Sequence, residues 1–202
     1  MSNILIHAAN FFGYAVIALF AQNAVFTRAL GVSRLTKMIE DGTDRWIFGI
    51  LLCCIQIIST PLGFWLNEQL KDYYYRIYLR PLIFILCSVF AFFLVLGVII
   101  ALKKLEVARR VVEVLPMATF HTCIIGTMLV TTSSGYTFTQ AMGFALGSSL
   151  GYMLAVEVVA EGMRKLSHHK IPYIFRGLPI TLLYIGILAI AIYGFTGHRV
   201  VF

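Results

Sequence analysis

The sequence predicts an all-α integral membrane protein, with six transmembrane helices arranged as two inverted repeats of three. Its 202 residues are 60% hydrophobic and 12% charged, and their mean hydropathy is +0.89. These values lie outside the range of soluble globular proteins. The second observation is length, because a transmembrane helix needs about 20 consecutive apolar residues. Five charge-free runs meet this requirement, at residues 1–27, 46–67, 81–102, 114–156 and 177–198.

The five runs give six helices when they are taken in order. The first has no basic segment and no small-residue cleavage site ahead of Arg28, so we expect it to stay as a helix and not to be removed as a signal peptide. The second contains Pro61, which should kink it. The third is an unbroken apolar block. The fourth run has 43 residues, enough for two helices, with TTSSGYT (131–137) as the turn between them. The fifth run, which begins at Gly177, gives the sixth helix.

The distribution of Lys and Arg predicts which side of the membrane each loop faces. Twelve of the 16 basic residues lie in the segments 28–45, 103–110 and 164–176, and the other four lie on the opposite side. Basic residues are retained on the cytoplasmic side. We therefore expect a multi-pass protein of the inner (plasma) membrane with both termini outside. Contact with anionic lipid then explains the net charge of +7, and no nucleic-acid partner is indicated.

The whole chain, 1–202, is predicted to be one membrane domain with repeats at about 1–105 and 106–202. Each repeat has an odd number of helices, so the second must enter the membrane from the other side, as in inverted-topology repeats. The first helix of each repeat is interrupted by polar residues, in AQNAVFTRALGVS (21–33) and in TFHTCIIGTMLVTTSSG (119–135). Broken first and fourth helices at matching positions predict a functional centre near the membrane midplane.

Neither a disulfide framework nor a metal site is indicated. All four cysteines lie inside predicted helices, where a thiol behaves as a small apolar group: Cys53, Cys54, Cys87 and Cys123. His121 and Cys123 are two residues apart, and such side chains point about 200° apart on a helix, so they cannot hold one ion together. Zinc would need about four His, Cys or carboxylate ligands, and the usual spacings are missing. We expect Gln56 to form a hydrogen bond to a neighbouring helix.

Polar residues near the two breaks are candidates for an ion or solute path: Gln22, Asn23, His121, Thr122 and Glu157. Glu157 is included because an ionisable group in or near the hydrocarbon layer is costly and defaults to a functional hypothesis. The alternative is a buried ion pair or a hydrogen bond to a neighbouring subunit. Glu161, four residues further on, can pair with Lys165 at the inner surface. The chain has no phosphate-binding loop, catalytic triad or dinucleotide fingerprint, so we expect no catalytic residues.

Gly143, Gly147 and Gly151 follow one another at four-residue steps in the fifth predicted helix. Small residues at this spacing form a ridge that lets another helix approach closely. We therefore assign these glycines to helix packing and not to a ligand site.

Several short motifs occur in the order found in one family of membrane proteins. They are NAVFTRALGVS (23–33), PMATFHTCIIG (116–126), GFALGSSLGYMLAVEVVAEGMRKL (143–166), IPYIFRGLPI (171–180) and GFTG (194–197). Together with the six predicted helices, these motifs resemble the Rnf/Nqr membrane subunits, and within them the RnfA and NqrE branch. The resemblance covers most of the chain and is firmest from Leu115 onward.

The resemblance implies a subunit of an electron-transfer complex that couples redox chemistry to sodium or proton movement. In that family two homologous subunits of opposite topology pair with each other. Each gives two cysteines, one from each broken helix, to a two-iron two-sulfur cluster within the membrane. Four thiolates are the usual requirement for such a cluster.

The chain departs from the family at both cysteine positions. The first broken helix of the family ends in Leu-Gly-Leu-Cys, and this chain has Ser33 in place of the cysteine. The second family cysteine lies six residues after the proline and four before the glycine. Counting from Pro116 to Gly126 puts Thr122 there, with Cys123 one residue late. One residue rotates a helical side chain by about 100°. We therefore expect no two-iron two-sulfur cluster held by this chain.

Three functions remain open from the sequence. The first is a membrane subunit without a cluster, acting as scaffold or ion path beside a paralogous six-helix subunit of an electron transport complex. The second keeps the electron-transfer role, with Cys123 as a displaced ligand and a partner group or a serine oxygen replacing the missing thiolate. The third is a small secondary transporter that uses the polar residues at the breaks. At most, the chain is an electron-transfer subunit of a membrane oxidoreductase.

Overall fold

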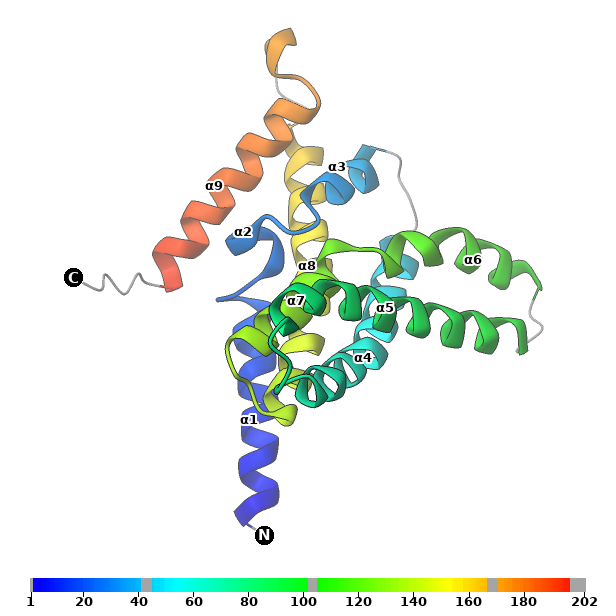
Figure 1. Ribbon diagram of the computed structural model, residues 1–202. Helices are drawn as coiled ribbons and strands as arrows, with labels where there is room; N and C mark the ends of the chain where they lie inside the picture. Colours follow the sequence, from blue (N-terminus) through cyan, green and yellow to red (C-terminus); the bar gives the residue numbers. More distant parts are fainter. Residues whose placement is uncertain (1, 41–44, 102–104, 167–170, 197–202) are drawn as a thin grey trace.

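The computed structural model describes residues 2–40, 45–101, 105–166 and 171–196, and within these ranges the chain is helical, without a β-strand (Figure 1). The elements are α1 (Ser2–Leu19), α2 (Ala24–Arg28), α3 (Val32–Glu40), α4 (Arg45–Gln69), α5 (Arg76–Ala101), α6 (Leu105–Thr119), α7 (Thr122–Ser133), α8 (Phe138–Leu166), the 3-10 turn η1 (Tyr173–Phe175) and α9 (Leu178–Thr196). The predicted all-α class is confirmed.

Three helices, α4, α5 and α8, are each long and apolar enough to cross a membrane. A fourth candidate span consists of α6 and α7 together, which bend by 44° at the break between Thr119 and Thr122. The apolar stretches of α1 and α9 are shorter, at Ile4–Leu19 and Leu178–Gly194, and fall below the about 20 residues of a straight span. The membrane class is therefore confirmed, with three or four helices in the described ranges that are long and apolar enough to span. The six-helix inverted repeat stays a prediction.

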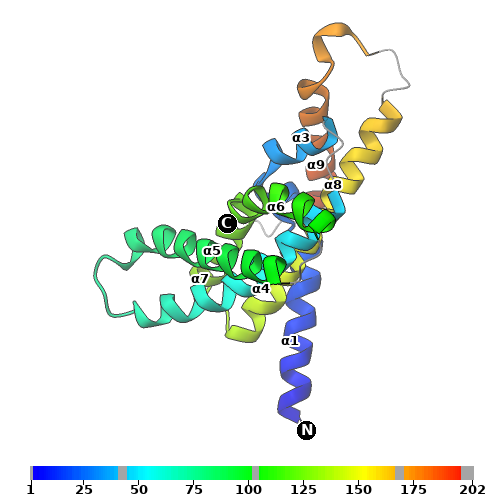
Figure 2. The ribbon, with the colours of Figure 1, turned by 90° about the vertical axis from the view of Figure 1, so that its right-hand side faces the viewer.

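The helix α8 lies at the centre and contacts elements from both ends of the chain. On one side α1 runs along it, and α4 and α7 pack against it elsewhere. In Figure 1, α9 leans away from this centre, and its neighbours are α2, α8 and η1. In Figure 2, α4 and α5 form a hairpin that projects to the left, while α9 lies in the upper part of the view. Side chains in the middle of α8 can therefore touch segments that are far apart in the sequence.

A ridge of glycines explains how α1 comes so close to α8. A Cβ atom on Gly143 or Gly147 would collide with the main-chain carbonyl of Phe11 or Ala15 in α1. Gly151 continues the ridge to the point where α1 ends. The packing predicted for these glycines is confirmed, and it fixes the first helix break against the middle of α8.

Candidate functional site

The first helix break is built around Asn23, which is 1% exposed. Its Oδ1 caps α2 by accepting hydrogen bonds from the main-chain N–H groups of Val25 at 3.0 Å and Phe26 at 3.4 Å. Its Nδ2 donates to the carbonyl oxygen of Leu19 at 3.0 Å and to that of Gly151 at 2.8 Å. One amide therefore bonds to the end of α1, the start of α2 and the centre of α8. Main-chain groups that would otherwise be unpaired at the break are satisfied in this way.

The turn that follows α2 has a left-handed backbone. Ala29 and Gly31 have φ values of 52° and 75°. The N–H group of Ala29 donates to the carbonyl oxygen of Val25, which is the hydrogen bond of an αL capping motif, and the N–H group of Leu30 donates to that of Ala24. The motif ends α2 sharply and turns the chain into α3.

The second break lies at His121, between α6 and α7. The extended backbone of this residue (φ −80°, ψ 132°) interrupts the helix, and its Nδ1 accepts a hydrogen bond from the N–H of Cys123 at 3.2 Å. A neutral imidazole whose Nδ1 accepts carries its proton on Nε2. That Nε2 is buried and has no hydrogen-bond partner among the described residues. The ring packs edge-on against Tyr152 and Phe48, with centroid distances of 4.5 and 5.4 Å.

The two breaks meet at Tyr152 in the middle of α8. The Tyr152 hydroxyl donates to the carbonyl oxygen of Gly31 over 3.2 Å, and its ring packs on His121. A Cβ atom on Gly31 would lie only 2.6 Å from His121 Nε2. Next to this contact, the Leu30 side chain lies against Gly126 in α7. The two interrupted segments singled out in the sequence are therefore adjacent in the fold.

Cys123 points into the protein, beside the second break. It is fully buried, and its Sγ lies 3.4 Å from the Ser148 hydroxyl in α8. The same hydroxyl shares a hydrogen bond of 2.8 Å with Thr127, one turn further along α7. The three side chains form a small polar contact between α7 and α8.

The two positions that the sequence analysis matched to the family's cysteines both face outward. Ser33 lies in the first turn of α3, Thr122 is the first residue of α7, and both are exposed. Cys123 is buried although it directly follows Thr122, because adjacent helical side chains differ by about 100° in direction. The side chains of Ser33 and Thr122 therefore lie outward, while the nearby Cys123 thiol lies inward.

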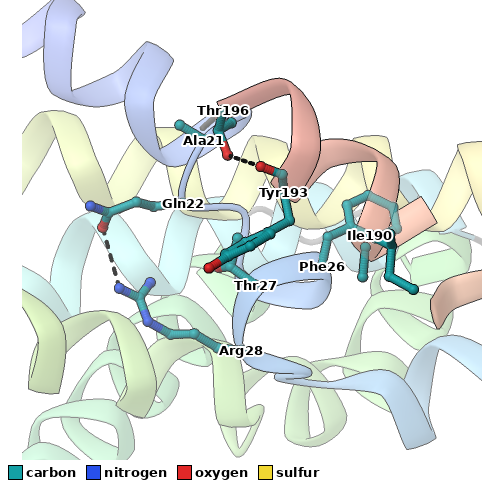
Figure 3. A pocket seen from close by; sticks show the side chains of 9 residues that line it. Ala21, Gln22, Phe26, Thr27, Arg28, Ile190, Tyr193 and Thr196 are labelled. Carbon is teal, nitrogen blue, oxygen red and sulfur yellow. Dashed lines mark hydrogen bonds between the residues drawn. The ribbon is translucent and has the colours of Figure 1, made fainter. Parts of the chain in front are cut away.

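A cavity of about 530 Å³ lies beside the first break, between α2 and the end of α9 (Figure 3). Its polar lining consists of Gln22, Thr27, Arg28, Tyr193 and Thr196. The Arg28 guanidinium donates to Gln22 Oε1 over 3.2 Å, as the dashed line in Figure 3 marks. Gln22, one of the predicted path residues, therefore faces this cavity beside a positive charge.

Glu157 forms a partly exposed ion pair with Arg45. Its Oε2 is 3.5 Å from Arg45 Nη1 at the start of α4, and the two side chains are 44% and 36% exposed. Glu161 pairs with Arg164 at 2.8 Å and with Lys165 at 4.0 Å. The pairing predicted between Glu161 and Lys165 is confirmed, and both carboxylates have cationic partners.

The cysteines are dispersed over the fold. Cys53 donates to the Ser149 hydroxyl at 3.1 Å, Cys54 is exposed, and Cys87 is buried in α5. In the part of the chain that the structure describes, no three His, Cys, Asp or Glu side chains come together as a metal site.

Sequence reasoning missed Tyr152 and Ser148, which connect α8 to the breaks. Their signal in the sequence is a set of polar groups within GSSLGY (147–152), and a packing ridge has the same appearance. The prediction that Gln56 forms a hydrogen bond to a neighbouring helix is wrong. Neither polar atom of its buried side chain has a partner in the described ranges. Two turns further along the same face of α4, Gly63 lies against the apolar side chains of Met128 and Phe84.

The sequence model of one protein family, the Rnf-Nqr subunits, matches residues 11–198, and the members of this family are membrane proteins. The chain belongs to the Rnf-Nqr family. The resemblance inferred from the order of the motifs is thereby confirmed.

Several relatives of this Rnf-Nqr chain align over nearly its whole length. It is 27% identical to a subunit of the ion-translocating oxidoreductase complex of Syntrophotalea carbinolica, over 89% of this chain and 93% of the relative. It is 25% identical to a subunit of the Na(+)-translocating ferredoxin:NAD(+) oxidoreductase complex of Acetobacterium woodii, over 91% and 95%. A shorter match, 31% identical over 41% of each chain, is to a subunit of the Na(+)-translocating NADH-quinone reductase of Saccharophagus degradans.

Proposed function

We propose that this chain is a membrane subunit of a redox-driven, ion-translocating electron transport complex of the Rnf/Nqr type. The observation that carries the proposal is the family match over residues 11–198. The relatives that are subunits of ion-translocating oxidoreductase complexes also align over about nine-tenths of the chain. The contact between the two helix breaks at Tyr152 supports it, since discontinuous membrane helices that meet are typical of sites of ion movement.

The proposed partner is a homologous six-helix subunit of opposite topology in the inner membrane. In this arrangement the chain has six spans as two inverted repeats, with α1 and α9 completing the count and both termini outside. The charge distribution and the two breaks support this topology. Reporter fusions at each terminus test it, and cytoplasmic ends would contradict it.

The subunit is proposed to hold no two-iron two-sulfur cluster of its own, because its side chains do not fit one. Such a cluster needs about four thiolates, two of them from this chain. The outward positions carry the hydroxyls of Ser33 and Thr122, and the Cys123 thiol is turned inward against Ser148. Its role in the complex is then that of a partner and part of the ion path.

A second candidate is a small secondary transporter or ion-path subunit that works without redox chemistry. The cavity at the first break, lined by Gln22 and Arg28, favours it. Asn23 and His121 already cap helices with their side chains, and Glu157 is paired with Arg45, so these three candidate path residues have structural roles as well.

The experiment is purification of the chain together with its co-expressed neighbours, followed by iron analysis, visible absorption and electron paramagnetic resonance. We expect co-purification with a second six-helix subunit, and iron content that is the same in wild type, Cys123→Ser and the control Cys87→Ser. Stoichiometric iron lost with Cys123→Ser alone would overturn the cluster-free assignment. Flux by the isolated chain that depends on Gln22 would favour the transporter.

A further inference from the structure

Three polar side chains on α4 have no hydrogen-bond partner in the part of the chain that the structure describes. Gln56, Ser59 and Thr60 are 0%, 0% and 1% exposed, and the side-chain oxygens of all three, with the Gln56 nitrogen, are unpaired. Residues at i, i+3 and i+4 lie on one face of a helix. The three side chains therefore form one cluster, the α4 polar cluster, inside a helix that is long and apolar enough to cross a membrane.

Several buried hydroxyls elsewhere in the described part of the fold bond to a main-chain carbonyl of their own helix. Thr119 donates to the carbonyl oxygen of Leu115 at 2.8 Å, and Ser88 donates to that of Phe84 at 2.9 Å. Back-bonding of this kind is the usual solution for Ser and Thr in helices. The α4 polar cluster does not use it, so its oxygens remain available to an external group. Within a membrane, such groups are costly unless they find a partner.

The face of α4 that carries the cluster packs against α8 as well as α5 and α7, since Cys53, one turn before Gln56, contacts Ser149 of α8. Gly63 lies on the same face of α4, and a Cβ atom there would approach Met128 of α7 and Phe84 of α5. There is no charged residue between 46 and 67 of α4, between 81 and 101 of α5, throughout α7, or between 138 and 156 of α8. Pro61 also removes the main-chain hydrogen bond that residue 61 would donate within α4. The segments of α5, α7 and α8 that pack on this face are therefore uncharged, and α4 lacks one backbone hydrogen bond beside the cluster.

We propose that Gln56 Oε1, Ser59 Oγ and Thr60 Oγ1 coordinate a monovalent alkali cation, with water completing the coordination and accepting from Gln56 Nε2. Oxygen atoms are the ligands that such hard cations prefer. The cost of transferring an ion into a medium of low dielectric constant rises with the square of its charge, so neutral oxygens favour a monovalent ion over a divalent one. The inference rests on the proposed function in treating this ion as the one that the complex moves.

The test is the thermal unfolding of the purified full-length chain in detergent, in NaCl, LiCl, KCl and choline chloride at equal ionic strength. A ligand that binds only the folded state raises the unfolding midpoint with its concentration. We expect a saturable rise with at least one alkali cation over choline. Ser59→Ala and Thr60→Val should abolish this rise, and Gln56→Glu should lower the cation concentration that gives half of it.

The matched control is Thr119→Val, which removes a buried hydroxyl that already has its partner in Leu115. It should keep the full cation-dependent rise.

The proposal is overturned if wild type unfolds at the same midpoint in all four salts, which would leave water alone as the partner. It is also overturned if the rise persists in both Ser59→Ala and Thr60→Val. The wild-type comparison stands even where a variant fails to fold. This test measures cation binding without the other subunits, so it is independent of the proposed function. If the chain shows the cation-dependent rise but does not co-purify with a redox complex, the proposed function is contradicted and the cation site is still supported.

Discussion

The side-chain nitrogen of Asn23 donates to the carbonyl oxygen of Gly151 over 2.8 Å, and this bond joins the first helix break to the central helix α8. The same side chain caps α2 through its oxygen. A residue that interrupts the first helix is thus also the residue that fixes the interruption in place. Removing its two functions separately shows how much each contributes.

Asn23→Ala should destabilise the protein by about 2–4 kcal/mol. A lost N-cap costs about 1 kcal/mol, and leaving buried carbonyl groups without their donor costs about 1–3 kcal/mol. Asn23→Ser keeps an oxygen that can cap α2 but loses the donor to Gly151, so it should fall between wild type and Asn23→Ala. Denaturant unfolding in detergent measures both. Equal losses in the two variants would mean that the bond to α8 carries the whole effect.

Gly147→Ala should cost about 1–3 kcal/mol of unfolding free energy, because the added methyl group has no space. Its Cβ would collide with the Ala15 carbonyl of α1, and overpacking of a close contact has a cost of this size. Gly186→Ala in α9 is the matched control, since nothing lies within 4 Å of a Cβ there. It should be neutral or slightly stabilising. Similar stability of the two variants would contradict the close approach of α1 to α8.

Glu157 and Arg45 should be coupled by no more than about 1 kcal/mol in a double-mutant cycle. Their atoms are 3.5 Å apart, but both side chains are more than one-third exposed, and such pairs contribute about 0–1 kcal/mol. Glu157→Gln, Arg45→Ala and the double variant give the cycle by thermal unfolding. A coupling energy of several kcal/mol would contradict the solvent-exposed position of the pair.

The sequence was sufficient to predict the helical membrane class, both helix breaks and the glycine ridge. Each of these depends on local composition or on spacing along one helix, as with the step from Gly143 to Gly147. Asn23 could also have been recognised as a helix cap, because asparagine is among the preferred N-cap residues.

The rest depends on contacts between distant segments. The bond from Tyr152 to Gly31 joins residues that are 121 positions apart, and no periodicity reports such a pair. The inward direction of Cys123 follows from where α7 begins, and helix boundaries are the least reliable part of a sequence-based prediction. The missing partner of Gln56 could not be foreseen either, because it depends on which side chains of α5 and α7 meet that face of α4.

Gly31→Ala should be the most damaging of the glycine substitutions at positive φ, because it adds a collision to backbone strain. Gly31 and Gly135 have φ values of 75° and 67°, so an alanine is strained at both, at a cost of about 1–2 kcal/mol. At Gly31 the Cβ would also lie 2.6 Å from His121 Nε2, whereas at Gly135 it would meet nothing within 4 Å. We therefore expect Gly31→Ala to lose about 1–3 kcal/mol more than Gly135→Ala in denaturant unfolding. Adding His121→Ala should recover part of that excess. If Gly31→Ala and Gly135→Ala are equally destabilised, the first break does not dock on the second.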